Sequence, residues 1–398
     1  LGRALVALAC LVIAYCVHSA LQPRFSQPLA TEAALGVAAA CLTLLVMLLL
    51  KRTEFREETV VRIAIAFAAA ALFLNRARPR LLAVLVLAAF AIVFIDDRVG
   101  GRVLSLQRSF FGVLRTEEHI APAPGTTLRV LMHGTTIHGA QLHGAPEIER
   151  RPLTYYSPNT ALGEAVLAGL SGGTANSLAL IGMGAGTTAC LMSPQDRLTV
   201  FEIDRKVVRL SAERGGLFTY IPDCQPHARI VLGDGRLSIA RERDRSFDVI
   251  LVDAFSSDAV PAHLLTEEAI ALYLRKTSAR GIVILHLSNR NLALVSEAVR
   301  VAHALNAPFL WRASERRDDR AAGIYGAMGA SVMILAHDPQ TLARLALASN
   351  DWHVLPTPPG RPWTDDYINL PRALYDNLNG REECLQSERR IGCASPRP

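Results

Sequence analysis

A glycine-rich turn is the first feature of this sequence whose residue types could do chemistry. Gly182-Met-Gly-Ala-Gly-Thr187 follows an apolar run and precedes a stretch with helical character, as a nucleotide-binding turn must. Glycines allow the backbone to approach a ligand without a Cβ in the way. NAD enzymes prefer Gly or Ala at the sixth position, which is Thr187 here. The turn therefore predicts a nucleotide site, with Gly182, Gly184 and Gly186 as the residues that approach the ligand.

Two acids stand where the next two strands are expected to end. Glu202 ends the following apolar run, 20 residues after Gly182, and a carboxylate at that place can accept both ribose hydroxyls. Asp234, in Gly233-Asp-Gly235, stands where S-adenosylmethionine-type sites place an acid against the adenine amino group. Taken singly, the glycine-rich turn could be an ordinary loop, and each of the two acids could be a solvated surface residue. At three successive strand ends they predict one nucleotide site, in which Glu202, Asp234 and Gly235 bind the ligand beside the turn.

A third polar segment directly follows a fourth strand. Asp253-Ala-Phe-Ser-Ser-Asp258 begins where the apolar run 247–252 ends, so we expect Asp253 to project into the same cleft. A serine-rich loop before Pro261 can move over a ligand. The alternative is an aspartate that caps the helix beginning at Thr266, but that helix lies far from Asp253 along the chain. We therefore predict that Asp253 faces the same cleft as the glycine-rich turn.

Alternating strands and helices must position these residues. Continuous apolar runs that alternate with helical segments are typical of an α/β fold with a parallel, doubly wound sheet, in which ligands bind at the carboxyl ends of the strands. A short strand and a polar-tipped hairpin at 128–141 precede this part. We expect strands at 177–183, 198–203, 229–232, 247–252 and 282–287, helices at 161–170, 187–192, 205–214, 266–277 and 292–305, and two runs at 308–313 and 331–336 that close the sheet.

The first 95 residues differ in composition from the rest. The chain has 398 residues, of which 51% are hydrophobic and 20% charged, and this excludes a mainly disordered protein. Apolar segments of 18, 20, 15 and 15 residues run over 4–21, 31–50, 60–74 and 81–95, and the first two are long enough to cross or nearly cross a bilayer. A buried or interfacial hairpin is the alternative for the shorter pair. We predict transmembrane α-helices, four in number, within residues 1–98.

Basic residues beside these segments predict their orientation. With four crossings, eight Arg and Lys residues fall on one side and four on the other, and the richer side is the cytoplasmic one. This distribution predicts a multi-pass protein of the inner (cell) membrane, with the lipid bilayer as a partner and the C-terminal part in the cytoplasm. The formal net charge is +6, without a dense basic block beside aromatic residues, so we do not expect nucleic acid as a partner.

Cysteines and histidines give no metal-binding pattern. Seven cysteines lie far apart, without a C-x-x-C spacing. His133, His138 and His143 are five residues apart, which is not a ligand spacing, and we interpret them, with His263, as turn residues or satisfied hydrogen-bonding residues. His286 lies in an apolar strand and is interpreted as packed in the core. We expect no metal cofactor.

Taken together, these stretches resemble the polyamine aminopropyltransferase (spermidine synthase) family, and most closely its membrane-attached bacterial branch. The similarity extends from about Leu128 to Leu370, roughly 60% of the chain. The segments that carry it are Leu178–Leu191, Val200–Asp204, Val231–Gly235 and Phe247–Asp258, with signature-like stretches at Arg151-Pro-Leu-Thr-Tyr-Tyr156, Asp253–Pro261 and Trp363-Thr-Asp-Asp-Tyr367.

The resemblance implies a domain order and a reaction. It implies a small β-domain with linker at 99–160, a Rossmann-like domain of the class I methyltransferase type at 161–375, and a C-terminal tail at 376–398. It also implies decarboxylated S-adenosylmethionine as the co-substrate and a diamine, such as putrescine, as the small-molecule polyamine substrate. The expected activity is therefore that of a membrane-anchored spermidine synthase-like transferase.

The resemblance also assigns roles to single residues. Glu202 matches the family's ribose-binding acid, Asp234 its adenine-side acid and Asp253 its catalytic aspartate. Tyr155 matches a tyrosine that lines the amine pocket, and Gln141 matches a polar residue of the β-domain that reaches the site.

A carboxylate suits this chemistry. Alkyl amines have a pKa near 10.4, whereas the attacking nitrogen must be neutral. Asp253 can orient the ammonium and accept its proton while the nitrogen attacks the propyl carbon. A dicationic diamine favours an acidic pocket, and Asp258, Asp365 and Asp366 are the candidate walls.

The sequence departs from the synthase pattern at two places. Synthases carry G-G-G-D-G-G, whose Asp holds the donor's amino group, and here that position is Ala185. Tyr156-Ser157 stand where synthases usually carry Gln/His-Glu. Intact S-adenosylmethionine is therefore an alternative donor. The alternative functions are an S-adenosylmethionine-dependent methyltransferase and a non-enzymatic ligand-binding domain on a membrane module, and the sequence leaves a homodimer open.

Overall fold

The computed structural model describes residues 101–380, apart from 135, 174, 255–260 and 320. The predicted membrane segments, Asp258 and the tail beyond residue 380 lie outside the described residues. Nearly all described residues belong to one compact unit, which begins at Arg102. In this part of the chain, no helix is both long and apolar enough to cross a membrane.

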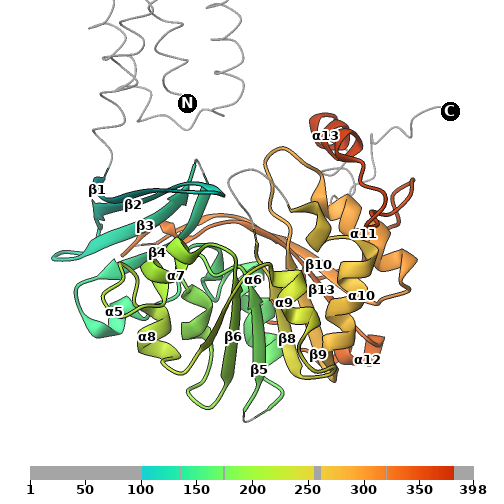
Figure 1. The fold of residues 1–398 in the computed structure, drawn as a ribbon, viewed down its shortest axis with the longest axis horizontal. Coiled ribbons are helices and arrows are strands. Elements are labelled where there is room, and N and C mark those ends of the chain that lie inside the picture. The colour runs from blue at the N-terminus through green and yellow to red at the C-terminus, as the bar shows by residue number, and fades with distance from the viewer. Residues whose placement is uncertain (1–100, 135, 174, 255–260, 320, 381–398) are drawn as a thin grey trace, which may run out of the picture. The chain divides into compact units, whose positions relative to one another are not determined.

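A small antiparallel sheet opens the described chain (Figure 1). Its strand order is β1-β2-β3-β4. The sequence pattern predicted the last two strands but not the first two. Strand β1 has no buried residue, and β2 buries the polar residues Thr116 and Glu117, so neither strand shows an apolar alternation. The bounds are β1 (Arg102–Ser109), β2 (Gly112–Ile120), β3 (Thr127–His133) and β4 (Thr136–His143).

A second sheet of seven strands carries the α/β architecture, in the order β10-β13-β9-β8-β5-β6-β7. The five strands β5 to β9 are parallel, whereas β13 lies antiparallel between β9 and β10. The expected parallel sheet is therefore a mixed one. No helix connects β10 to β13 within the described residues, and parallel neighbours need a crossover that is usually helical. The bounds are β5 (Ser177–Ile181), β6 (Arg197–Glu202), β7 (Arg229–Leu232), β8 (Phe247–Val252), β9 (Thr277–His286), β10 (Phe309–Ser314) and β13 (Ala330–Ala336), and a separate hairpin is formed by β11 (Arg317–Asp319) and β12 (Gly323–Ala327).

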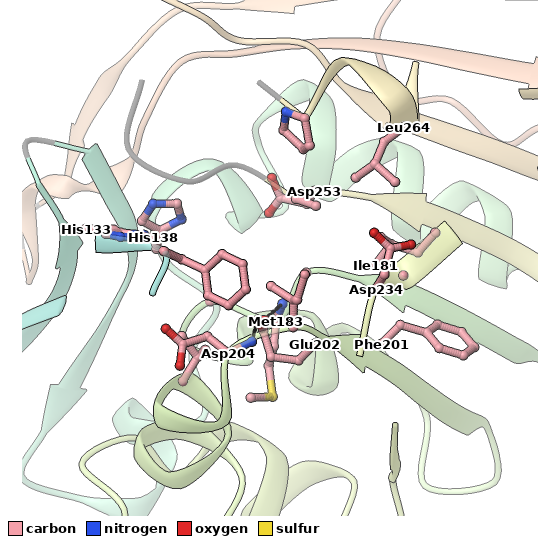
Figure 2. Close-up of a pocket in the computed structure, with 18 of the residues that line it drawn as sticks. His133, His138, Ile181, Met183, Phe201, Glu202, Asp204, Asp234, Asp253 and Leu264 are labelled. Carbon is pink, nitrogen blue, oxygen red and sulfur yellow. Dashed lines mark hydrogen bonds between the residues drawn. The ribbon is translucent and has the colours of Figure 1, made fainter. Parts of the chain in front are cut away.

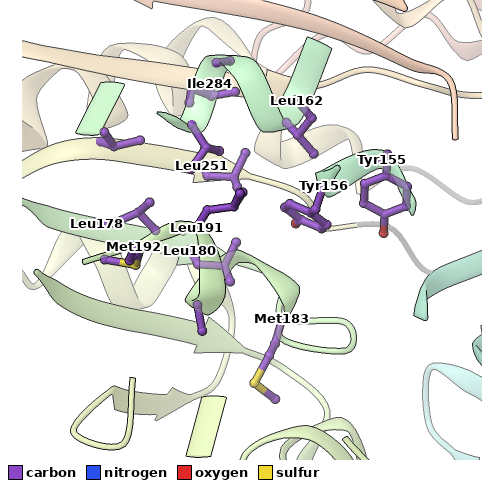
Figure 3. Close-up of a cluster of buried hydrophobic side chains, with 14 of the residues drawn as sticks. Tyr155, Tyr156, Leu162, Leu178, Leu180, Met183, Leu191, Met192, Leu251 and Ile284 are labelled. Atoms are coloured by element: carbon purple, nitrogen blue, oxygen red, sulfur yellow. The ribbon is translucent and has the colours of Figure 1, made fainter. Parts of the chain in front are cut away.

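Both faces of the large sheet are covered. Along β5, Leu178 and Leu180 belong to one hydrophobic cluster, whereas Ala179 and Ile181 belong to another on the opposite face. Helices α6 and α7 contribute to the first cluster, part of which is drawn in Figure 3, and α9, α10 and α11 contribute to the second. The helices are α5 (Pro146–Glu149), α6 (Ala161–Leu170), α7 (Arg205–Ser211), α8 (Tyr220–Cys224), α9 (Gly235–Ala240), α10 (Glu267–Lys276), α11 (Leu294–Ala304), α12 (Pro339–Ala343) and α13 (Leu370–Leu378).

The segment after the glycine-rich turn differs from its prediction. We expected a helix at 187–192, but the chain forms one 3-10 turn, η2 (Thr187–Leu191). Two β-branched residues at its start and Pro194 shortly after it leave no room for a longer helix. A disulfide between Cys190 and Cys224 joins this turn to α8, a pairing that the cysteine spacing did not predict.

Candidate active site

A cavity of about 300 Å³ lies at the carboxyl ends of the parallel strands, where the small sheet approaches them (Figure 2). Four of its lining residues are acids that follow or end three different strands: Glu202, Asp204, Asp234 and Asp253. The strand order thus brings the predicted acids of the nucleotide site and the predicted catalytic acid to one cavity, as expected for ligands of open α/β sheets.

The glycine-rich turn has its expected left-handed backbone, with φ of +88° at Gly182, +53° at Gly184 and +83° at Gly186. Gly182 and Gly184 line the cavity, but Gly186 does not. A Cβ on Gly182 would collide with the carbonyl oxygen of Asp253, and one on Gly184 with that of His138. The glycines are therefore required by the close approach of β8 and β4, whatever ligand the turn also meets.

Glu202 ends β6 and faces the cavity. Its Oε2 accepts a hydrogen bond from the Met183 N–H (2.9 Å), and its Oε1 accepts one from the Asp204 N–H (2.8 Å). Burial raises the pKa of the Glu202 carboxyl, and these backbone donors oppose that rise. A carboxylate has about four acceptor sites, so Glu202 can still accept a hydroxyl group of a ligand.

Asp234 both caps a helix and lines the cavity. Its Oδ1 accepts from the Leu237 N–H at the start of α9 (2.8 Å), and its Oδ2 lies 3.0 Å from His263 Nε2. Gly235 also lines the cavity, and a Cβ there would press on Ile181. Asp234 can therefore cap α9 and still face a ligand in the cavity.

Asp253 is held by two partners that the sequence analysis did not assign to the site. The Tyr156 hydroxyl donates to its Oδ2 (2.5 Å), and its Oδ1 lies 2.6 Å from His286 Nδ1. The Nε2 atom of His286 in turn lies 2.9 Å from Ser288 Oγ. The Asp253 side chain is only 8% exposed, and a buried carboxylate needs such partners.

A register argument could have found His286. Val252 pairs with Leu285 in the parallel strands β8 and β9, so Asp253 and His286 are the next residues on adjacent strands. The interpretation of His286 as a core residue was incomplete, because it is buried but contacts the predicted catalytic acid.

Neither Tyr155 nor Tyr156 lines the cavity. Tyr155, expected in the amine pocket, is buried outside the cavity lining, with its ring 4.9 Å from that of Tyr156 and 4.7 Å from that of His286. The hydroxyl that reaches Asp253 is that of Tyr156. Burial and the neighbouring Asp253 raise the pKa of Tyr156 well above its usual value, so this hydroxyl stays protonated and donates.

Three other predicted substrate-side residues do not line the cavity. Gln141 is fully buried, and its amide nitrogen donates to Thr219 Oγ1 and to the Glu149 carbonyl. Asp365 forms a two-pronged ion pair with Arg236, with both contacts at 2.6 Å, and Asp366 is exposed. Asp258 lies outside the described residues.

Residues of the small sheet form the wall beside Asp253. His133 and His138, interpreted from sequence as turn or satisfied residues, line the cavity. Ala185 does not: it is 1% exposed, its N–H donates to the His138 carbonyl (3.1 Å), and a Cβ on Gly139 would collide with its methyl group. The position at which synthases carry an acid is thus packed under β4.

Sequence comparisons relate part of the chain to enzymes. No protein-family model matches it. The chain is 31% identical over 110 residues to a polyamine aminopropyltransferase of Vibrio vulnificus, covering 26% of this chain and 35% of that protein. It is 26% identical over 163 residues to a probable polyamine aminopropyl transferase of Bifidobacterium longum, covering 40% and 33%. The chain thus spans about a third of the length of the curated relatives it matches.

Structure comparisons give lower identities. A probable spermidine synthase of Corynebacterium glutamicum is 16% identical with a TM-score of 0.43, over 60% of this chain and 85% of that one. The spermidine synthase of Thermotoga maritima is 14% identical with a TM-score of 0.43, over 71% and 87%. The two relatives found by sequence are a polyamine aminopropyltransferase and a probable one, and this chain resembles them over part of their length.

Proposed function

We propose that this chain is a membrane-anchored aminopropyltransferase. It transfers an aminopropyl group from decarboxylated S-adenosylmethionine to a primary amine, for which the resemblance implies a diamine such as putrescine. One observation carries the proposal: Asp253, held by Tyr156 and His286, shares a cavity with Glu202 and Asp234 at the ends of neighbouring strands. The sequence relatives support it.

The donor binds at the end of the cavity that is formed by β6 and β7. Glu202 accepts hydrogen bonds from the ribose hydroxyls, and Asp234 accepts one from the adenine amino group. Both carboxylates are fixed by backbone donors, so they are oriented before the ligand arrives.

Asp253 directs the reaction at the other end. It accepts a proton from the acceptor ammonium while the nitrogen attacks the propyl carbon. A C–N bond forms, the C–S bond breaks, and its electron pair neutralises the sulfonium, so methylthioadenosine leaves as a neutral thioether. Tyr156 and His286 keep the carboxylate in one orientation throughout, which preserves the alignment on which the rate depends.

Methyl transfer is the second candidate, and Ala185 favours it. This position offers no carboxylate to a donor ammonium, since the methyl group is buried against β4. A methyl donor with its amino acid tail intact does not require an acid at this position.

Donor choice separates the two candidates. We would titrate the full chain, purified in detergent, with decarboxylated S-adenosylmethionine, S-adenosylmethionine and methylthioadenosine by calorimetry. We would then follow methylthioadenosine release in the presence of amines. We expect the decarboxylated donor to bind and react, and Asp253→Asn to lower kcat by about 10²–10⁴-fold. The exposed Asp223→Asn is the matched control.

The outcomes are distinct. Preference for intact S-adenosylmethionine, with methylated product, would replace aminopropyl by methyl transfer. Binding of none of the three ligands by a folded chain would overturn both candidates and leave the non-enzymatic alternative.

Membrane attachment is a separate part of the proposal and rests on the apolar segments within residues 1–98. We expect the full chain to stay in the membrane pellet after alkaline carbonate extraction of cells. Release into the supernatant would contradict the anchor and leave the catalytic proposal unaffected.

A further inference from the structure

Asp204 lines the cavity but has no role in the proposed transfer. Among the described lining residues, Glu202 and Asp234 belong to the nucleotide end, where the ribose and the adenine are proposed to bind, and Asp253 engages the attacking nitrogen. The Asp204 N–H donates to Glu202 Oε1 (2.8 Å). In Figure 2, the labelled Asp204 lies on the side of His138, opposite Asp234. Asp204 is therefore on the small-sheet side of the cavity, beside the residue that is proposed to bind the ribose.

One oxygen of the Asp204 carboxylate has a structural partner, and the other has none. Its Oδ1 accepts from the Lys206 N–H (2.8 Å) and so caps the start of α7. Its Oδ2 is buried and has no hydrogen-bond partner within the described part of the chain, and Asp204 as a whole is only 6% exposed. Buried polar atoms are rarely left unpaired, and a buried charge is costly without a partner. A ligand group in the cavity can supply the donor that Oδ2 lacks.

The described lining of the cavity supplies no fixed cation for this oxygen. It contains no lysine or arginine. The amine of the nearby Lys206 donates instead to the Arg108 carbonyl. Burial lowers the pKa of His138 to about 4, so its imidazole is neutral near pH 7. Four acids without a lysine or arginine beside them favour a ligand that carries positive charge.

The proposed substrates carry ammonium groups that suit this oxygen. Decarboxylated S-adenosylmethionine has a primary ammonium at the end of its aminopropyl chain, and a diamine has a second ammonium beyond the attacking nitrogen. Position 185, where synthases carry an acid for the donor ammonium, is an alanine packed under β4. A hydrogen bond between an ammonium and a carboxylate is about twice as strong as one between neutral groups.

We propose that Asp204 is a further substrate-binding residue, whose Oδ2 accepts a hydrogen bond from a primary ammonium group other than the attacking nitrogen. That ammonium belongs to the aminopropyl chain of the donor or to the distal end of a diamine, which offer the same chemistry. The inference rests on the proposed aminopropyl transfer and adds a residue to which the resemblance assigns no role.

Two pairs of ligands separate these sources, because the members of each pair differ only in one ammonium. The first pair is decarboxylated S-adenosylmethionine and its sulfonium analogue with a butyl group in place of the aminopropyl group. The second pair is putrescine and n-pentylamine. We would measure the four dissociation constants on the full chain in detergent by calorimetry, and those of the two amines both with and without methylthioadenosine.

The variant Asp204→Asn removes the charge but keeps the cap of α7, because asparagine caps helices as well as aspartate does. We expect it to bind the ammonium member of one pair at least about tenfold more weakly than the wild type does. Binding of the methyl-terminated member and the thermal unfolding midpoint should change little. A loss in the first pair identifies the donor ammonium, and a loss in the second identifies the distal ammonium of the diamine.

A matched control is available at another helix cap. Asp338 caps α12 through the Thr341 N–H (3.0 Å) and does not line the cavity, so Asp338→Asn should leave all four dissociation constants unchanged. If Asp204→Asn leaves the ratio of dissociation constants in both pairs as it is in the wild type, the inference is overturned.

The failure of the proposed function has a different signature. If the wild type releases no methylthioadenosine from the donor in the presence of amines, the proposed transfer is wrong. The ligand pairs still decide the inference, because their binding does not require turnover. Binding of neither ammonium ligand by the folded wild type would overturn the inference as well.

Discussion

At the scale of single residues, the partners of Asp253 determine what the site can do. Its carboxylate accepts from Tyr156 and contacts His286 while being nearly inaccessible to water. We expect Tyr156→Phe to lower kcat by about 10–100-fold, since a hydrogen bond to a charged group contributes about 1.5–3 kcal/mol. The KM for the donor should stay the same, because Tyr156 lies outside the nucleotide end.

Steady-state kinetics of methylthioadenosine release would test this. Tyr155→Phe is the matched control, because the Tyr155 ring stacks on His286 but its hydroxyl does not bond to Asp253. A Tyr156→Phe enzyme with the wild-type kcat would show that the hydrogen bond has no part in catalysis.

Ala185 gives a second prediction at this scale. If its small side chain were simply a lost acid, Ala185→Asp would improve donor binding. The structure predicts the opposite, because position 185 is buried against Gly139 and offers a carboxylate neither space nor a partner. We expect Ala185→Asp to lower the thermal unfolding midpoint of the full chain, with Ala185→Ser as the milder control. A stable variant with tighter donor binding would contradict this packing.

His138 predicts how stability depends on pH. Its pKa is about 4 in the folded chain and 6.5 in the unfolded one. Between these values the unfolded state binds a proton that the folded state does not, so stability falls as the pH decreases from 6.5 to 4. We expect unfolding midpoints across this window to fall less steeply in His138→Gln than in the wild type. Parallel curves would show that His138 is not buried in the neutral form.

At the scale of elements, a buried ion cluster attaches the C-terminal helix α13. Glu297 of α11 is fully buried and contacts Arg300 (2.8 Å) and Arg372 (2.6 Å), and Arg300 also contacts Asp376 of α13 (3.3 Å). Removing one member of a buried cluster leaves uncompensated charges, which costs about 3–5 kcal/mol. We therefore expect Glu297→Gln to destabilise the fold and to speed hydrogen exchange in α13. The exposed Glu213→Gln is the control, and unchanged exchange in α13 would contradict the role of the cluster.

Elements with a strong local signal were predictable from the sequence, and those that depend on tertiary contacts were not. Helix α6 matches its predicted bounds because Thr160 caps its first turn and every residue of the helix except Glu164 is apolar or glycine. Strands β1 and β2 lack such a pattern, and η2 is stopped after a single turn. The antiparallel place of β13 depends on the route of the connection from β10, which no local pattern encodes.

The site likewise combines residues that a local sequence signal predicts with residues that only tertiary contacts bring together. The common place of Glu202, Asp234 and Asp253 at one cavity was predictable, because each stands at a strand end and parallel strands end at one edge of the sheet. Tyr156 and His138 come from segments before the large sheet, and only the docking of the small sheet brings His138 to the cavity. Gln141 was expected at the site, but its side chain is turned towards Thr219 and does not line the cavity.

At the scale of the whole molecule, the disulfide of the structure can be compared with the redox state expected in the compartment that the predicted membrane orientation implies. The arginines and lysines beside the apolar segments predict a cytoplasmic location for the described unit, and thiols in the cytoplasm are kept reduced. The structure joins Cys190 to Cys224 across 34 residues, a loop for which a disulfide contributes about 3–4 kcal/mol. The redox state of this cysteine pair in cells therefore indicates the compartment in which the unit resides.

We expect this pair to be reduced in cells and oxidised in protein purified without reductant. Thiols would be alkylated in intact cells before lysis, and the modified peptides would be counted by mass spectrometry. The purified protein should lose thermal stability on reduction, and Cys190→Ser should lack that response. Because a cytoplasmic unit has access to the donor nucleotide, a reduced pair agrees with both the orientation and the proposed reaction. A pair already oxidised in cells would place the unit on the opposite side of the membrane and would require a donor supplied there.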